Sequence, residues 1–481
     1  MSNLLLVLYV GVVGVLSAHG LHRLVLLWQW RRLRARVPVA PPMDPARIPM
    51  VTVQLPVYNE RDVVARLNDA AAALDWPKDR LEIQLLDDSV DDTGDRAAGA
   101  IARARAHGIS IERVARPDRL GYKAGALAWG LSRAHGEFVA IFDADFVPRP
   151  DFLRATVPHF ADAGVGMVQV AWDHLNADES VLTQAQAVLL DGHFRVEQVA
   201  RNRSGAWFNF NGTAGVWRRT CIDAAGGWQH DTLTEDLDLS YRAQLAGWRF
   251  VFLEDHAAPA ELPDTLAAFH AQQRRWAKGS IETGRKLAGR IARAPAPRTT
   301  RLEALSHLGA NLAWPLVVLL SVLLPLVVLG RGSASTGHLW LDLPIFGFSI
   351  GSNALFYWHA SPTRRRWLPA VLALGIGMAI SQSVAVWEGL RGRPSEFLRT
   401  PKNGGTGGSY RAAALAFPWE LPLGALHLGT AAWAASHLQF GAIPFLLLFG
   451  LGYSWVGGAA LLTWRLPRTA EVVVSDAVMG K

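Results

Sequence analysis

Cysteine is nearly absent from this sequence, which limits how the chain can be stabilised. Cys221 is the only cysteine in 481 residues, so no disulfide can form within the chain, as suits a reducing compartment. The formal net charge of +7 would suit a nucleic-acid-binding protein, but no nucleic-acid-binding motif is present. The arginines cluster beside apolar segments instead, at 31–36 and 364–366. We therefore expect contact with the anionic headgroups of a lipid bilayer and no nucleic-acid partner.

A basic stretch ahead of the first apolar run is also lacking, as is a small-residue cleavage site. Residues 4–28 are apolar and long enough to cross a bilayer, and the basic cluster at 31–36 follows them. A cleaved signal peptide, the alternative, would carry its basic residues before the run. Because basic residues accumulate on the cytoplasmic side, we predict a transmembrane helix that leaves the following domain in the cytoplasm, at the plasma or inner membrane.

Long apolar runs return only after a mixed and charged middle section. Half of all residues are hydrophobic, yet 45–300 has the composition of a soluble domain. The run at 368–390 has basic clusters on both sides, so we predict an interfacial or re-entrant helix on the cytoplasmic side. Four other runs are predicted to span the membrane: 312–330, 341–360, 412–435 and 441–464. Together with 4–28 they give five crossings.

Strand-like and helical stretches alternate between residues 50 and 172. This alternation predicts an α/β domain with a mostly parallel sheet and helices on both faces. The predicted strands cover 50–57, 81–87, 109–115, 137–143 and 165–172, and the predicted helices cover 60–74, 91–107 and 123–135. In such folds, ligands bind beyond the carboxyl ends of the strands.

Acidic residues follow two of these strands at that position. Asp87 and Asp88 come after the second strand, while Asp143 and Asp145 interrupt the apolar run "EFVAIFDADF". Unpaired buried carboxylates are costly, so a positive group is expected beside them. The D-x-D spacing suits Mg²⁺ or Mn²⁺ with substrate phosphates as further ligands. Helix capping or a turn is the alternative for a lone D-x-D.

Two later segments contain polar residues that could take part in catalysis or binding. "HDTLTEDLDLSYRAQLAGW" (230–248) predicts a helix that starts at Thr232 or Thr234, with Asp236 as a general base at its start. A capping box between Thr232 and Glu235 is the structural alternative.

"AAFHAQQRRWAKGS" (267–280) predicts a helix with Gln272, Arg275 and Trp276 on one face. A basic helix lying on the membrane is the other interpretation, supported by three cations: Lys278, Arg285 and Lys286.

Together, these segments resemble the processive family 2 glycosyltransferases, which include the synthases of cellulose, hyaluronan and mannan. The matching motifs, in order, are D, D-x-D, T-E-D and Q-x-x-R-W, and they cover roughly residues 50–285. "GYKAGAL" (121–127) and "FNGTAGVWRR" (210–219) are most similar to the cellulose-synthase-like A group, whose members make mannan or glucomannan. The resemblance implies a GT-A-type sheet domain inserted between transmembrane helices. It also implies an inverting transfer from a nucleotide-activated sugar to a β-glycan.

The resemblance also implies a role for each matching residue. Asp236 would be the catalytic base with Glu235 beside it, and Asp145, more than Asp143, would hold Mg²⁺ or Mn²⁺. The acceptor would contact Gln272, Trp276, Asn211 and Gly212. The nucleotide sugar would contact Tyr58, Glu60, Asp87, Asp88, Lys123, Asp143, Asp145 and Arg275.

"FLRTPKNGG" (397–405) resembles the gating loop of cellulose synthases. Phe397, Thr400 and Lys402 match that loop, whereas Arg399 replaces a valine. A flexible basic linker is the alternative.

These predictions divide the chain into segments. They are a membrane helix (1–36), a catalytic domain (45–260), interface helices (261–300), a membrane region (301–466) with an interfacial part (368–390) and the gating-like loop (391–410), and a short tail (467–481).

The predicted function is that of a membrane-embedded glycan synthase. It would transfer a hexose from GDP-mannose or UDP-glucose to a growing β-linked polysaccharide, β-1,4 by resemblance, with possible translocation. A membrane glycolipid synthase that adds one sugar from UDP-glucose to a lipid acceptor is the alternative. A non-catalytic transporter or scaffold is disfavoured because all the expected carboxylates are present.

Overall fold

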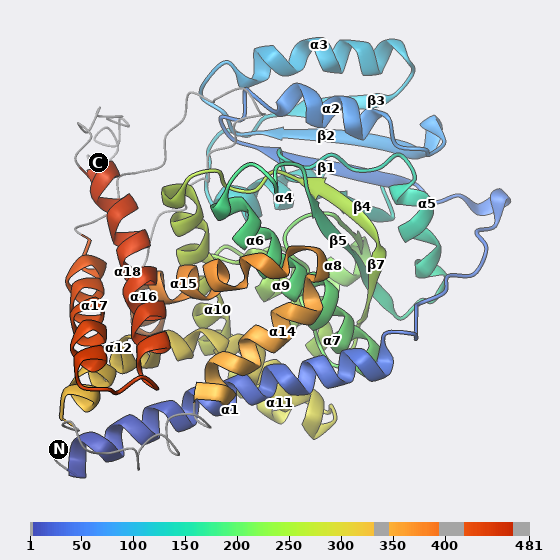
Figure 1. Ribbon diagram of the computed structural model, residues 1–481. Helices are drawn as coiled ribbons and strands as arrows, with labels where there is room; N and C mark the ends of the chain where they lie inside the picture. Colours follow the sequence, from blue (N-terminus) through green and yellow to red (C-terminus); the bar gives the residue numbers. More distant parts are fainter. Residues whose placement is uncertain (1–2, 331–345, 394–417, 465–481) are drawn as a thin grey trace, which may run out of the picture.

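The computed structural model describes residues 3–330, 346–393 and 418–464. Within these, one sheet of seven strands forms the centre of the polar domain, in the order β3-β2-β1-β4-β6-β5-β7 (Figure 1). Most neighbours are parallel, and only β6 runs antiparallel, between β4 and β5. The strands are β1 (Val51–Val57), β2 (Leu81–Asp87), β3 (Ser110–Val114), β4 (Phe138–Ile141), β5 (Val165–His174), β6 (Gly215–Arg218) and β7 (Arg249–Ala260).

The five predicted strands correspond to β1 to β5, whereas β6 and β7 were not predicted. β2, β1 and β4 lie side by side and parallel, with Val57 opposite Asp87. Their carboxyl ends therefore meet at one edge of the sheet, as the sequence predicted. β4 ends at Ile141, so Asp143 and Asp145 lie beyond the strand rather than inside it.

Helices cover both faces of the sheet because successive strand residues point to opposite sides. In β4, Phe138 and Ala140 pack into the core under α2 (Val64–Ala72) and α3 (Thr93–Ala106). Val139 and Ile141 pack into the other core, with α4 (Tyr122–Leu131). Other helices of this domain are α5 (Phe152–Thr156), α6 (Val181–Asp191), α7 (Val199–Ser204), α8 (Arg219–Ala224), α9 (Glu235–Leu245) and α10 (Leu266–Arg293).

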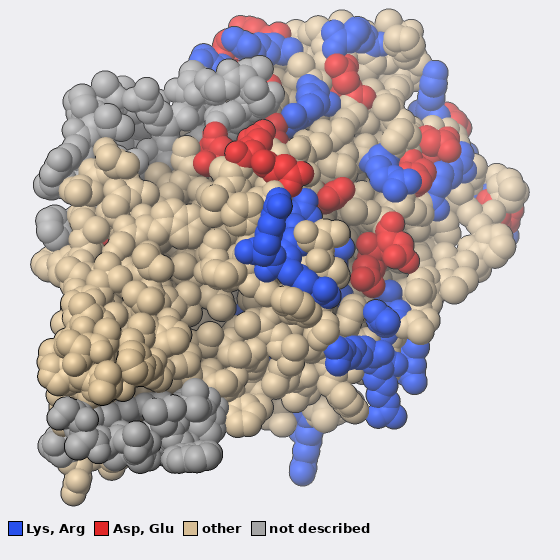
Figure 2. All heavy atoms as spheres, in the orientation of Figure 1, with Lys and Arg blue, Asp and Glu red and all other residues tan. Residues whose placement is uncertain are grey.

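The apolar helices gather on the side of the molecule away from the outer strands β2 and β3 (Figure 1). On the face shown in Figure 2, most charged side chains lie over the sheet domain, and few lie over the helices farthest from it. The helices outside the sheet domain are α1 (Asn3–Leu33), α11 (Arg298–Gly309), α12 (Ala313–Gly330), α14 (Ser352–Ala360), α15 (Leu368–Gly377), α16 (Ala379–Arg391), α17 (Glu420–Ser436) and α18 (Ile443–Trp464).

Three helices in the described residues are long and apolar enough to cross a membrane: Asn3–Leu33, Arg298–Gly330 and Ile443–Leu462. They include or largely cover the runs predicted at 4–28, 312–330 and 441–464. Pro362–Gly377 and Ala379–Arg391 form a further apolar pair bent by 47°, which fits either a broken span or a re-entrant loop. The interfacial placement of 368–390 stays a prediction. So does the total of five crossings, because the runs at 341–360 and 412–435 extend beyond the described residues.

Candidate active site

One pocket gathers the predicted site residues at the carboxyl edge of the sheet. It is bounded by the ends of β1 and β4, the start of α9 and one face of α10. Every predicted donor, acceptor and catalytic residue within the described chain lines it, except Asp87. The lining includes Tyr58, Glu60, Asp88, Lys123, Asp143, Asp145, Asn211, Gly212, Glu235, Asp236, Gln272, Arg275 and Trp276.

The positive partner expected beside the D-x-D pair is Lys123, at the start of α4. Its Nζ donates to Asp143 Oδ1 at 2.5 Å and to the carbonyl of Gly212 at 2.9 Å. Burial alone would lower the pKa of Lys123, but Asp143, Glu235 and Asp236 outweigh it and raise the pKa, so the ammonium stays charged. Asp145 is buried at the pocket wall. One Asp143 oxygen is therefore engaged by the lysine, and both carboxylates line the same pocket.

The two aspartates at the end of β2 have separate surroundings. The Asp87 side chain is fully buried and accepts from Arg113 Nε at 2.7 Å, so it lies outside the pocket lining. The contact of Asp87 with a donor stays a prediction. Asp88 does line the pocket, and Arg116 holds both of its oxygens, at 2.7 and 2.6 Å. This paired geometry fixes the plane of the Asp88 carboxylate.

The general-base candidate sits in the first turn of α9. The predicted capping box is wrong, because α9 begins at Glu235 and Thr232 donates to the carbonyl of Thr234 instead. Asp236 Oδ1 accepts from Leu237 N at 2.7 Å. Burial, followed by repulsion from Glu235, raises the pKa of Asp236 to about 7. A carboxylate with this pKa is suited to accept a proton near neutral pH.

The loop before β6 reaches the same pocket because β6 is antiparallel, so its start lies beside the end of β4. Ala214 N bonds to Ile141 O at 2.8 Å, and Thr213 Oγ1 accepts from Asp143 N at 2.9 Å. Gly212 has a φ of +83°, and a Cβ there would lie 2.9 Å from Asp236 Oδ2. Glycine is therefore favoured at this position by its positive φ and by the closeness of Asp236.

The face of α10 predicted from its spacing is confirmed, because Gln272, Arg275 and Trp276 all line the pocket. Burial lowers the pKa of Arg275, while the nearby carboxylates counteract this shift.

The three cations cited for a membrane-lying α10 have partners within the chain. Lys278 Nζ bonds to Arg393 O, Arg285 Nη1 bonds to Gly389 O, and Lys286 pairs with Asp231. The placement of α10 on a membrane surface stays a prediction.

Several pocket residues were not predicted from sequence. Arg119 stacks over the Tyr58 ring with its Cζ 3.3 Å from the centroid, and Tyr122, Trp172, His174 and Glu261 also line the pocket. Arg119 could have been suspected from its position just before "GYKAG". Trp172, His174 and Glu261 could not, because they reach the pocket only through the pairing of β5 with β7.

The described residues contain no cluster of three or more histidine, cysteine or acidic side chains arranged to hold a metal ion. The gating-like residues Phe397, Arg399, Thr400 and Lys402 lie outside the described part of the chain.

Comparison with known proteins shows what this domain is similar to. Residues 49–279 match the family model described as "Glycosyltransferase like family 2". The predicted resemblance is thereby confirmed.

The relatives are more specific. Over 253 residues the chain is 46% identical to glucomannan 4-beta-mannosyltransferase 2 of Arabidopsis thaliana, covering 52% of this chain and 47% of that protein. Over 258 residues it is 44% identical to glucomannan 4-beta-mannosyltransferase 1 of Oryza sativa subsp. japonica, covering 53% and 50%. The chain thus spans about half the length of these curated relatives.

A solved structure confirms the GT-A-type fold. It is a mannosyltransferase from Pyrobaculum calidifontis in complex with GDP-Man and Mn²⁺. The TM-score is 0.57 at 24% identity, over 80% of this chain and 100% of that one.

Proposed function

We propose that this protein is a membrane-embedded, inverting mannosyltransferase that transfers mannose from GDP-mannose to a growing β-1,4-linked mannan or glucomannan. The observation that carries the proposal is the single pocket that joins the D-x-D carboxylates, the α9 carboxylates and the Q-x-x-R-W face. Two findings support the choice of sugar. The curated relatives are mannosyltransferases at 44–46% identity, and the solved relative has a GDP-Man complex.

The residues at the pocket wall fit a divalent cation only together with the donor. Asp145, and the Asp143 oxygen not held by Lys123, would supply two carboxylate ligands. Mg²⁺ and Mn²⁺ accept further oxygens, and the diphosphate of a nucleotide sugar would provide them. When bound, such an ion would neutralise the charge that develops on the leaving diphosphate. Arg275, which faces the same carboxylates, would add a guanidinium to the phosphates.

The chemistry of the remaining residues follows from their positions. An acceptor hydroxyl beside Asp236 would give its proton to that carboxylate as its oxygen bonds to C1 of the donor sugar. The bond from C1 to the phosphate oxygen breaks at the same centre, and the nucleoside diphosphate departs. Attack from the side opposite the phosphate inverts the configuration at C1. Gln272 and Trp276, on the α10 face, would hold the acceptor sugar in line, which lowers the entropic cost of the reaction.

The membrane setting completes the proposal. The helices long and apolar enough to cross a membrane flank the catalytic domain on both sides in sequence. The basic cluster at 31–36 follows α1, which supports a cytoplasmic position for the domain. A pocket at the cytoplasmic surface would have access to cytoplasmic nucleotide sugars.

The decisive experiment is to incubate the purified full-length protein in nanodiscs with labelled GDP-mannose and Mn²⁺, and then to size the product. We expect a polymer that an endo-β-1,4-mannanase degrades and that does not form with EDTA. Parallel reactions with labelled UDP-glucose test the donor.

Three results would refute parts of the proposal. Label confined to the organic-solvent phase would indicate a glycolipid product. A polymer made only from UDP-glucose would overturn the choice of donor. Full transfer in EDTA would overturn the metal dependence.

A further inference from the structure

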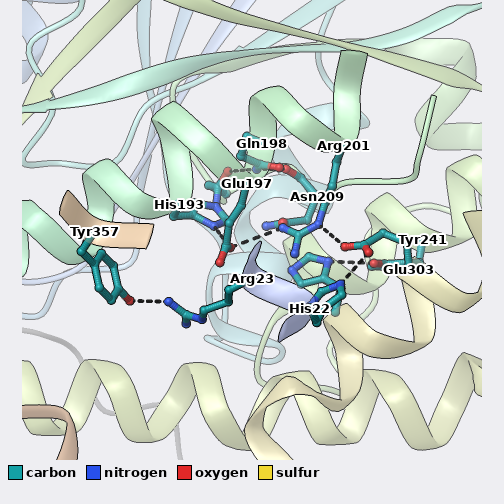
Figure 3. A network of polar contacts seen from close by, with 12 residues as sticks. His22, Arg23, His193, Glu197, Gln198, Arg201, Asn209, Tyr241, Glu303 and Tyr357 are labelled. Carbon is teal, nitrogen blue, oxygen red and sulfur yellow. Dashed lines mark hydrogen bonds and ion pairs between the residues drawn. The ribbon is translucent and has the colours of Figure 1, made fainter. Parts of the chain in front are cut away.

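A π-helix lies next to the pocket and interrupts an otherwise continuous helical segment. η4 (Gly192–Gln198) joins α6 to α7 and carries His193, Glu197 and Gln198 (Figure 3). π-helical turns are rare, and they occur often at functional sites. This one contacts the loop before β6, which forms part of the pocket wall.

The π geometry explains how two residues of η4 reach the same side chain. His193 and Gln198 are five positions apart, and in an α-helix they would point about 140° away from each other. The i→i+5 hydrogen bonds of a π-helix widen the turn and bring such a pair toward one face. Both side chains bond to the amide of Asn211, at 2.8 Å each.

The direction of each hydrogen bond in this group is determined by its neighbours. The backbone carbonyl of Asn209 can only accept, so the nitrogen of Gln198 faces it at 2.9 Å. The same nitrogen donates to Asn211 Oδ1, and the Asn211 amide must therefore turn its nitrogen toward His193. Because Nε2 of His193 accepts this bond, the imidazole proton is on Nδ1, which faces Glu197 Oε2 at 3.3 Å.

Glu197 is held in its charged form by the groups around it. Burial would raise its pKa, but the hydrogen bond with His193 and the charges of Arg201 and Arg23 outweigh burial, and the pKa falls well below its usual value. A carboxylate that stays charged favours the Nδ1–H form of His193.

The same network anchors Glu197 to the apolar helices (Figure 3). Arg201 lies between Glu197 and Glu303 of α11, at 3.5 and 2.9 Å. His22 of α1 contacts Glu303 at 2.7 Å, and Arg23 of α1 donates to Tyr357 of α14 at 2.7 Å. Glu197 is thus linked, through Arg201 and Glu303, to helices that lie outside the sheet domain.

Asn211 lies where the fixed direction of its amide would affect a bound substrate. It lines the pocket, and its backbone nitrogen is fixed by Gln169 Oε1 at 3.0 Å. The next residue, Gly212, approaches Asp236 and Lys123 so closely that a Cβ would meet both. Asn211 and Asp236 thus line the same pocket, and the residue after Asn211 lies beside Asp236.

We propose that Glu197 and His193 are positioning residues, which fix the Asn211 amide so that it binds a hydroxyl group of the acceptor sugar beside Asp236. This inference rests on the proposed function, since it assigns a partner to the same pocket. A sugar hydroxyl both donates and accepts hydrogen bonds, and an amide turned by 180° would offer the wrong group. Removal of His193 therefore weakens acceptor use through Asn211 and leaves donor binding intact.

The test is a double-mutant cycle with His193→Leu and Asn211→Ala in nanodiscs. We expect each single variant to lower kcat/KM for a mannan oligosaccharide by about tenfold, with unchanged affinity for GDP and Mn²⁺. The double variant should be no worse than Asn211→Ala alone. His193→Gln should recover most of the activity, because the Gln oxygen can accept at the Nε2 position. Equal losses from His193→Leu in both backgrounds would overturn the proposal.

The matched control is His307→Leu, which removes another enclosed imidazole, one bonded to the Tyr241 hydroxyl at 2.8 Å. It should lower thermal stability without coupling to Asn211→Ala. Equal coupling of the His307 and His193 variants would indicate a merely structural role for the network.

A wild-type protein that transfers no mannose would refute the proposed function. The contact itself would then be judged from the thermal unfolding of the four cycle proteins. Non-additive melting temperatures support the His193–Asn211 contact, and additive ones overturn it.

Discussion

Replacing Asp236 with asparagine tests the catalytic assignment with the least change in shape. Asparagine keeps the size of the side chain but cannot take a proton from the acceptor, so we expect kcat to fall by about 10²–10⁴-fold. That loss corresponds to about 3–5 kcal/mol in activation free energy. The pocket already holds Glu235 and Asp143, so removing one negative charge should leave the affinity for the GDP diphosphate unchanged or tighter.

The measured size of this loss should depend on pH. With a pKa of about 7, Asp236 is almost fully ionised at about pH 8.5 and only about one-tenth ionised at about pH 6. The ratio of wild-type to variant rates should therefore be about tenfold larger at the higher pH. The assay is the initial rate with labelled GDP-mannose, with GDP affinity measured by calorimetry.

Asp231→Asn is the matched control, because Asp231 precedes α9, is exposed and pairs with Lys286 at the protein surface. It should retain the wild-type rate. An Asp236→Asn protein with more than about a tenth of the wild-type kcat at about pH 8.5 would refute the base assignment.

Three further predictions concern the same pocket. The acid limb of wild-type kcat/KM should rise with pH through about 7, because Asp236 must lose its proton to act, and this limb should vanish in Asp236→Asn; a limb unchanged in the variant would contradict the assignment. Gly212→Ala should lower kcat at least about tenfold and melt a few degrees earlier, since its φ of +83° is strained for alanine and its Cβ would meet Asp236; a wild-type initial rate would argue against this close approach. Asp145→Asn should weaken GDP binding in Mn²⁺ by about a hundredfold and leave binding in EDTA unchanged, as measured by calorimetry; equal metal dependence in both proteins would exclude Asp145 as a ligand.

The chemistry of the pocket was largely predictable because its parts follow local patterns. The alternation of strand-like and helical stretches predicted β1, β2 and β4, with acidic residues after β2 and β4, and the structure places the carboxyl ends of these strands together. The i, i+3, i+4 spacing predicted the shared face of Gln272, Arg275 and Trp276, since helix geometry alone decides it. These inferences needed no knowledge of contacts between distant segments.

Predictions from sequence were wrong or absent where contacts between distant segments determine the structure. The capping box was wrong, because Thr232 donates to the carbonyl of Thr234 and α9 begins at Glu235, and the sequence did not reveal the partners of the α10 cations within the chain. Asp87 was grouped with Asp88, yet Arg113 from the neighbouring strand holds it outside the pocket. Each of these outcomes depends on a partner elsewhere in the chain that local sequence does not reveal.

The amino-acid sequence by itself determined which side chains carry the chemistry, their order along the chain and the strands and helices that bear them. Only the tertiary structure decided that β6 runs antiparallel and brings Asn211 and Gly212 to the base, and that a π-turn joins His193 to Asn211. The physical reason is that the direction of a strand depends on which strands it pairs with, and a buried hydrogen bond depends on both of its partners. In each case the partners are residues far apart in the sequence.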